Sequence, residues 1–219
     1  MIKSDNPKES IVLVHGLMRS SKSMHHLGEY LRHNGYEIYL YNYPSTQYKI
    51  DEHGAQLKIF IDGILSETNN KKIHFITHSL GGIITREALG LLSKEQLKQC
   101  NSLIMLSPPN QGSPLAKLLI KYAPFITRFI HPLAELSCSH EAYVHQVAVP
   151  DGMMIGIIAG RFDAKTPPSV TTLNGQKDFL IINTTHTFIM NHPNTRKAII
   201  KFLKYGNFST LPKSSEESK

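Results

Sequence analysis

The sequence predicts an α/β fold built on a mostly parallel sheet. Short runs of apolar, β-branched residues, beginning with residues 11–14, have the unbroken hydrophobicity of strands that are buried on both faces. Segments with apolar residues at helical spacing lie between these runs, and this alternation is typical of parallel strands joined by right-handed crossovers. Polar residues follow the ends of several runs, where an open parallel sheet places its functional groups.

The elements can be assigned in chain order from these patterns. Strands are expected at residues 11–14, 37–42, 73–78, 102–106, 153–159 and 179–183. Apolar stripes at helical spacing predict helices at residues 24–33, 51–67, 83–92 and 198–203. Asn34-Gly35 ends the first helix, and Tyr43-Pro44 ends the second strand.

Residues 111–150 interrupt the alternation of strands and helices. One short helical stripe spans residues 115–122, Pro124 breaks it, and a second stripe spans residues 125–130. Inserted beside the carboxyl ends of the strands, this segment is expected to form a cap over a pocket. The alternative, equally weighted, is that its helices simply complete the packing of the domain.

Length and composition set the domain organisation. The chain has 219 residues, which favours a single domain over residues 1–208, and residues 209–219 have the composition of a disordered tail. The net charge of +7 is compatible with anionic lipid or acidic substrates, although a solvated surface is the favoured interpretation. The sequence has no basic run interleaved with aromatic residues, so nucleic acid is not an expected partner. It does not indicate an oligomeric state.

The sequence does not predict a cofactor or metal site. It has no glycine-rich phosphate loop, and Cys100 and Cys138 are too few for a disulfide framework or a cysteine metal site. His25 and His26 lack a carboxylate or cysteine partner at ligand spacing. No apolar run is long enough to span a bilayer, and residues 1–9 lack the apolar region of a secretory signal, so a cytoplasmic location is expected.

The strand predicted at residues 73–78 runs directly into a sharp turn that begins a helix. Ser79 occupies the apex of this turn, where the backbone must be strained and small neighbours are needed. Gly81 meets that need on one side, whereas Thr77 stands on the other side, where glycine is usual. The backbone amide of Leu80, at the start of the helix, can face a developing oxyanion.

An acid and a base are expected at the carboxyl ends of two later strands. Asp163 closely follows the strand at residues 153–159, and His186 closely follows the last strand. Histidine can take a proton from a serine hydroxyl near neutral pH, and a carboxylate can orient the imidazole. Asp151 and Asp178 are weaker candidates for the acid, because each precedes its strand and would lie at the opposite edge of the sheet.

Other polar residues near these positions are expected to have structural roles. His192 stands at the start of the last helix and suits a cap. His78, beside the turn, is expected to pack or form a hydrogen bond, and His15 is expected to shape the loop that holds the oxyanion. Arg86 could steer an acidic substrate, but it is interpreted as an exposed helical residue without a specific role.

These residues together resemble the α/β-hydrolase family, in particular its small bacterial lipases and esterases related to GPI inositol-deacylases. The resemblance covers most of residues 11–203 and follows the chain order of nucleophile, acid and histidine. The matching pieces are Val12-Leu13-Val14-His15-Gly16-Leu17, Thr77-His78-Ser79-Leu80-Gly81-Gly82, Ser107-Pro108-Pro109-Asn110-Gln111-Gly112-Ser113, Asp163, and Thr185-His186-Thr187-Phe188. One departure is Ala164, where relatives usually have a glycine after the acid.

The resemblance implies an α/β-hydrolase fold with about six parallel strands, helices on both faces and a short helical insert. It also implies a cofactor-free serine hydrolase that cleaves carboxylic esters, as an esterase or lipase acting on a small ester or lipid. Ser79 would attack the carbonyl, His186 and Asp163 would complete the triad, and the amides of Leu17 and Leu80 would hold the oxyanion. The alternatives are a thioesterase, and an inactive hydrolase fold that binds ligands or docks on a membrane through its positive charge.

Overall fold

Six strands form one parallel sheet in the computed structural model, which describes residues 9–67, 72–139 and 141–208. The strands lie in the order β2-β1-β3-β4-β5-β6, and each neighbouring pair is parallel. They are β1 (Ser10–Val14), β2 (Glu37–Tyr41), β3 (Ile73–His78), β4 (Cys100–Leu106), β5 (Met154–Gly160) and β6 (Asp178–Ile182). The predicted α/β-hydrolase sheet is therefore confirmed, and the expected strand ends differ by only one or two residues.

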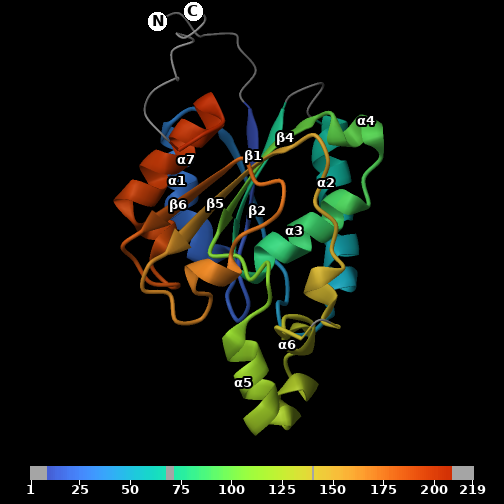
Figure 1. Ribbon diagram of the computed structural model, residues 1–219. Helices are drawn as coiled ribbons and strands as arrows, with labels where there is room; N and C mark the ends of the chain where they lie inside the picture. The colour runs from blue at the N-terminus through green and yellow to red at the C-terminus, as the bar shows by residue number, and fades with distance from the viewer. Residues whose placement is uncertain (1–8, 68–71, 140, 209–219) are drawn as a thin grey trace, which may run out of the picture.

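Helices cover both faces of this sheet (Figure 1). One face packs against α1 (His25–His33) and α7 (Pro193–Tyr205), and the other packs against α2 (Ile50–Glu67) and α3 (Leu80–Gly90). The shorter helices are α4 (Lys94–Leu97), α5 (Pro114–Tyr122) and α6 (Pro132–Glu135). Five 3₁₀ turns complete the described elements: η1 (Ser21–Met24), η2 (Pro124–Arg128), η3 (Tyr143–His145), η4 (Pro168–Val170) and η5 (Ile189–Asn191).

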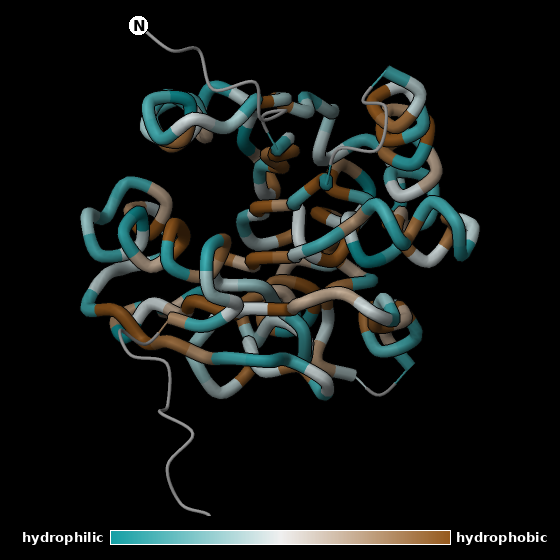
Figure 2. The backbone as a smooth tube through the Cα atoms, turned by 90° about the horizontal axis from the view of Figure 1, so that it is seen from above, coloured by the Kyte–Doolittle hydropathy of each residue, from teal (hydrophilic) through white to brown (hydrophobic). Residues whose placement is uncertain are grey.

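The apolar strands supply the core on both faces of the sheet. In β1, Val12 and Val14 pack with the cluster under α2 and α3, whereas Ile11 and Leu13 pack with the cluster under α1 and α7. Side chains alternate between the two faces of a strand, so a strand covered on both faces must be apolar at every inner position. Figure 2 shows the hydrophobic strand segments gathered in the interior, with the more hydrophilic segments around them.

The order of the strands creates a switch point beside β1. The chain passes from β1 outward to β2 and then returns to pair β3 on the other side of β1. The loops that follow β1 and β3 are therefore neighbours at the carboxyl edge of the sheet. Ligands of open α/β sheets bind at such a point, and the loops found there carry Leu17 and Ser79.

The insert predicted at residues 111–150 has two structurally different parts. Its first part, α5 and η2, projects from the carboxyl edge of the sheet (Figure 1), and its tip exposes Tyr122, Phe125 and Phe129. Its second part, which begins with α6, contributes Leu133 and other residues to the core under α2 and α3. The second predicted stripe forms a 3₁₀ turn instead of an α-helix because it begins at Pro124, where the missing N–H and fixed backbone angle favour a new, tighter turn.

Two expectations fall outside the described residues. These are the disordered tail at residues 209–219 and the absence of a secretory signal at the N-terminus, which rests mainly on residues 1–8. Within the described ranges, no helix combines the length and the hydrophobicity needed to cross a lipid bilayer.

Candidate active site

Ser79 lies at a strained turn between β3 and α3. Its backbone has φ 51° and ψ −125°, a conformation that residues with a side chain rarely adopt. The turn is held on both sides, because the Ser79 amide donates to the Leu106 carbonyl at 2.9 Å and the Ser79 carbonyl accepts from the Gly82 amide at 2.9 Å. Such strain persists only where surrounding contacts determine it, and it is concentrated at functional sites.

Two glycines allow the loops around Ser79 to approach closely. A Cβ atom on Gly81 would lie 2.4 Å from the His15 carbonyl oxygen, so only glycine allows α3 to begin against the end of β1. A Cβ atom on Gly16 would lie 2.9 Å from Nδ1 of His78 and 3.0 Å from the Ser79 Cβ. The loop after β1 therefore lies directly against the serine turn.

His15 and Tyr43 fix the start of that loop. Their rings stack with centroids 4.2 Å apart, and the Tyr43 hydroxyl donates to the His15 carbonyl at 2.8 Å. His15 Nε2 accepts from the Tyr43 amide at 3.3 Å, which leaves Nδ1–H to donate to the Gly16 carbonyl at 3.0 Å. Burial lowers the pKa of His15, so the ring stays neutral and shapes the loop.

The two amides predicted to hold an oxyanion flank the serine. Leu80 is the first residue of α3, where backbone amides have no acceptor within the helix. Leu17 lies in the loop after β1 and lines the same cavity as Ser79. In the part of the chain that the structure describes, neither amide donates to a protein acceptor, so both N–H groups remain available to a ligand oxygen.

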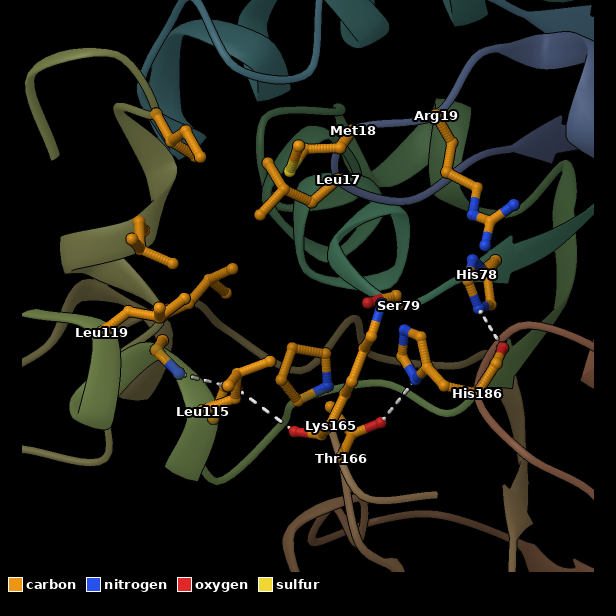
Figure 3. Close-up of a pocket in the computed structure, with 16 residues that line it drawn as sticks. Leu17, Met18, Arg19, His78, Ser79, Leu115, Leu119, Lys165, Thr166 and His186 are labelled. Atoms are coloured by element: carbon orange, nitrogen blue, oxygen red, sulfur yellow. Dashed lines mark hydrogen bonds between the residues drawn. The ribbon is translucent and has the colours of Figure 1, made fainter. Parts of the chain in front are cut away.

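Asp163 and His186 form a buried hydrogen-bonded pair. His186 Nδ1 lies 2.7 Å from Asp163 Oδ2, with the imidazole N–H donating to the carboxylate. Burial alone would raise the pKa of Asp163, but the hydrogen bond and positive charge of His186, together with the Thr166 amide, hold that pKa below its usual value. In Figure 3 the other ring nitrogen of His186 faces Ser79, and both residues line one cavity.

Thr166 is part of this arrangement, although the sequence analysis did not identify it. Its hydroxyl oxygen lies 2.9 Å from Asp163 Oδ2, 2.9 Å from His186 Nδ1 and 3.2 Å from the Ser107 carbonyl oxygen. The amides of Lys165 and Thr166 both donate to Asp163 Oδ1, at 2.9 and 2.8 Å. A threonine three residues after the acid was the only sequence signal for this role, and it is a weak one.

His78 supports the site and stays neutral. Its ring lies against that of His186, with centroids 4.7 Å apart, and its Nε2–H donates to the His186 carbonyl at 3.0 Å. Burial and then the neighbouring His186 charge lower the pKa of His78 to about 3. His78 is thus a hydrogen-bonding residue, as the sequence predicted, and does not compete for protons near neutral pH.

The alternative candidates lie away from this cavity. Asp178 is at the opposite end of β6, where its carboxylate accepts from the Phe208 amide at 2.6 Å, and Asp151 is exposed before β5. His192 caps α7 by accepting from the Asn194 amide at 3.2 Å. Within the described ranges, histidine, cysteine and carboxylate side chains do not gather into a possible metal site.

Arg86 corrects one expectation from the sequence. It is 3% exposed rather than a surface residue, and it does not line the cavity. Its guanidinium donates to Asn110 Oδ1 at 3.1 Å, to the Ala148 carbonyl at 3.2 Å and to the Val147 carbonyl. Burial lowers its pKa to about 10, so it remains charged at neutral pH and ties the segment before β5 to α3.

The cavity beside Ser79 has an apolar half and a polar half. Its volume is about 160 Å³, and its walls come from the loops after β1, β3, β4, β5 and β6 and from the insert. The apolar wall consists of Leu115, Ala116, Leu119, Ile130, Leu133 and Leu136, together with Leu17. Arg19 and Lys165 also line the cavity, and neither was identified from the sequence.

The structure resembles several solved hydrolases. The lipase BlEst2 of Bacillus licheniformis in its mature form superposes with a TM-score of 0.72 and 18% identity, over 92% of this chain and 93% of that chain. A monoacylglycerol lipase of Paleococcus ferrophilus gives a TM-score of 0.61 and 20% identity, over 90% of this chain and 94% of that chain. These likenesses show that the fold is that of the α/β-hydrolases.

Comparison of sequences also finds a relative and a family. The lysosomal thioesterase PPT2-B of Xenopus laevis is 31% identical over 107 residues, which are 47% of this chain and 36% of that protein. The family described as "Putative serine esterase (DUF676)" matches residues 4–122, more than half of the chain, and this range includes Leu17, Ser79 and Leu80. The chain therefore belongs to this family, DUF676, whose members are described as putative serine esterases.

Proposed function

We propose that this hydrolase cleaves carboxylic esters through an acyl-enzyme, with Ser79 as nucleophile, His186 as general base and Asp163 as the acid of the triad. The observation that carries the proposal is the meeting of a strained serine and a buried His186–Asp163 pair at one cavity. A serine hydroxyl is a weak nucleophile at neutral pH, so it requires a base, and the base requires an orienting carboxylate.

The proposed reaction follows from these positions. His186 Nε2 takes the Ser79 proton while the oxygen attacks the ester carbonyl, and the amides of Leu17 and Leu80 stabilise the negative oxygen. His186 then gives the proton to the departing alcohol, which leaves an acyl group on Ser79. A water molecule next attacks the acyl carbonyl while His186 takes its proton, and His186 returns that proton to the Ser79 oxygen as the acid leaves. Asp163 stays ionised throughout, consistent with its lowered pKa, and stabilises the imidazolium.

The apolar half of the cavity supports an acyl chain as the acid portion of the substrate. Apolar side chains of α5 and α6 line one side of Ser79, including Leu115, Leu119 and Leu133. We therefore propose that residues 111–150 act as a cap within a single domain of residues 1–208. A thioester is the alternative substrate, because the same chemistry releases a thiol and the Xenopus laevis relative is named a thioesterase.

Peripheral contact with anionic lipid is a further part of the proposal. The tip of the cap exposes Tyr122, Phe125 and Phe129, and Lys117 and Lys121 stand on the neighbouring helix α5. Aromatic side chains beside lysines suit the interface of an anionic membrane. Co-sedimentation with phosphatidylserine vesicles but not with neutral vesicles would support this contact. Equal sedimentation with both kinds of vesicle would exclude a contact specific to anionic lipid.

Labelling with a fluorophosphonate probe tests the proposed function. The probe reacts with activated serines, so we expect covalent labelling of the wild type, complete loss in Ser79→Ala, and retention in Ser66→Ala, which changes an exposed serine of α2. A folded wild type that resists the probe would instead indicate an inactive binding module.

A second test concerns the acid of the triad. Turnover of a nitrophenyl ester should fall far more in Asp163→Asn than in Asp178→Asn; equal losses would refute the assignment of the acid.

A further inference from the structure

Two cations stand at the rim of the cavity on the loops that carry the candidate catalytic residues. Lys165 is two residues after Asp163, and its backbone is fixed, because its amide donates to Asp163 Oδ1 and its carbonyl accepts from the Ser113 hydroxyl at 3.3 Å. From this fixed position the Lys165 side chain runs toward Ser79 (Figure 3). The geometry of the acid loop thus presents the ammonium group to the cavity.

Arg19 lies on the loop after β1 and is held by its side chain rather than by its backbone. It is two residues beyond Leu17, and its Nη2 donates to the Thr187 hydroxyl at 3.2 Å. Thr187 directly follows His186, so this bond joins the oxyanion loop to the histidine loop. One contact uses only part of the donor fork of a guanidinium, and the remaining N–H groups can bind a ligand.

Among the residues that the structure describes, no carboxylate lines the cavity to balance these two charges. Within the described ranges, neither Arg19 nor Lys165 forms an ion pair, and the cavity lining includes no aspartate or glutamate. Asp163 lies behind His186 and is already bonded to His186, to the Thr166 hydroxyl and to two amides. Cations that line a partly apolar cavity without a counter-ion attract an anionic ligand group.

The arrangement also indicates which portion of the substrate carries the anion. In Figure 3, Ser79 lies between Leu115 and Leu119 on one side and Arg19 on the other. The acyl chain suits the apolar side. Because His186 must give its proton to the departing group, that group has to lie on the side of His186, where Arg19 is bonded to the next residue.

From this placement we propose that the substrate is an acyl ester or thioester whose leaving group carries an anionic substituent, a carboxylate or a phosphate, bound by Arg19 and attracted by Lys165. This inference rests on the proposed function, since it takes Ser79 as the attacking group and His186 as the proton donor. Arg19 is suited to direct binding, because its planar fork matches the oxygens of both anions. Lys165 adds a flexible point charge on the path to Ser79.

A matched pair of esters tests the proposal kinetically. The octanoyl esters of 4-hydroxybenzoate and 4-hydroxybenzamide differ mainly in the charge of the leaving group. We expect the wild type to prefer the anionic ester by about tenfold in kcat/KM, the size of one charge-assisted hydrogen bond. Arg19→Met should reduce this ratio to near one, Lys165→Met should reduce it in part, and added salt should weaken it in the wild type.

A control variant removes a charge from the same edge of the sheet but outside the cavity. Arg161 is exposed directly after β5 and does not line the cavity beside Ser79, so Arg161→Met should retain the preference of the wild type. If the wild type cleaves both esters equally, or if Arg19→Met keeps the full preference, the anion site is refuted while ester hydrolysis stands. The S-octanoyl ester of 4-mercaptobenzoate, run in parallel, distinguishes a thioester from an oxygen ester.

A binding measurement makes the test independent of catalysis. Calorimetric titration with octyl phosphate should show binding to the wild type and to Ser79→Ala that is about tenfold weaker in Arg19→Met and unaffected in Arg161→Met. Inorganic phosphate alone should bind far more weakly, because it lacks the chain; equally tight binding would identify a site for free phosphate and overturn the proposal. If neither ester is hydrolysed but this pattern is seen, the proposed catalysis fails and the anion site remains.

Discussion

Asp163 illustrates how much of the site depends on single hydrogen-bond donors. Its Oδ1 accepts two backbone amides, and its Oδ2 lies near both the Thr166 hydroxyl and His186 Nδ1. Donors around a carboxylate favour its charged form, which explains why its pKa is lowered despite burial. They also fix the direction in which the carboxylate faces His186. Thr166 is the one member of this set whose side chain can be removed without changing the acid or the base.

We therefore expect Thr166→Val, which keeps the shape and removes the hydroxyl, to lower kcat/KM for a nitrophenyl ester by about tenfold, the worth of one buried hydrogen bond to a charged group. Thr166→Ser should restore most of the rate, because it returns the hydroxyl. Thr171→Val is the matched control, since Thr171 is also buried but its hydroxyl donates to the Pro168 carbonyl. A serine variant as slow as the valine variant would show that packing, not the hydroxyl, matters at this position.

The sequence pointed to candidate residues at strand ends more readily than to residues in the loops between them. Ser79, Asp163 and His186 each follow an apolar strand, and strands are recognisable from composition alone. Thr166, Arg19 and Lys165 stand in irregular loops, where the direction of a side chain depends on local backbone angles that have no periodic signal. Their proximity to the cavity also depends on contacts between loops distant in sequence, such as that of Arg19 with Thr187.

At the scale of elements, the insert is anchored at its base and exposed at its tip. A bridge between Ser113 and Ser137 closes its base, and the Ser113 amide donates to the Leu136 carbonyl at 2.7 Å. Glu135 accepts from the Ile50 amide at 2.8 Å and so caps the start of α2. These bonds fix α6 against the body of the protein, so the apolar wall that α6 presents to the cavity is built on a rigid part of the insert.

The wall of the cavity on α5 should set the preferred length of the acyl chain. Ala116 is buried against the cavity, and Ala116→Leu would fill part of the apolar half. We expect the kcat/KM for the octanoyl nitrophenyl ester, divided by that for the butanoyl ester, to fall by about tenfold. The reason is that fitting a long chain against a bulkier wall costs roughly 1–3 kcal/mol. A thermal melt would check that the variant is folded.

A control on the same helix separates volume in the cavity from volume on the surface. Leu118 is 54% exposed and is not part of the cavity lining, so Leu118→Phe should keep the ratio of the wild type. An unchanged ratio in Ala116→Leu would mean that the chain binds elsewhere. If the wild type itself cleaves acetate fastest, with a steady fall for longer chains, the preference for lipid is wrong and a short-chain esterase is the better description.

Burial of whole elements was harder to predict than their presence. Periodicity predicts α3 but does not reveal that nearly all of its sides are buried, so the sequence favours an exposed Arg86. The cause is the segment before β5, which covers α3 and offers the Val147 and Ala148 carbonyls to the arginine. A segment without regular secondary structure gives no sequence pattern that reveals which helix it covers.

At the scale of the whole molecule, several histidines in the described part of the chain are fully buried. His15, His53, His74 and His78 are each at most 1% exposed, and burial lowers the pKa of all four, that of His53 to about 4 and that of His78 to about 3. A histidine that is buried and neutral in the folded state becomes an ordinary base when the chain unfolds. Below pH 6.5 the unfolded chain therefore binds more protons than the folded protein.

The protein should accordingly lose stability on mild acidification. As the pH falls from 6.5 toward 4, each such histidine contributes a loss of up to about 1.4 kcal/mol per pH unit, because protonation favours the unfolded chain. Asp163, with its lowered pKa, adds a loss of stability only near and below pH 4.

His53 offers the sharpest test of this pH dependence, since neither of its ring nitrogens has a hydrogen-bond partner within the described ranges and it packs against Tyr43 and Tyr48. Urea unfolding at several pH values gives the slope of the free energy of unfolding against pH, which reports how many more protons the unfolded chain binds. We expect this slope to be smaller by nearly one proton in His53→Phe, and unchanged in His26→Gln, which replaces an exposed histidine. Identical slopes for all three proteins would show that His53 is not buried in its neutral form.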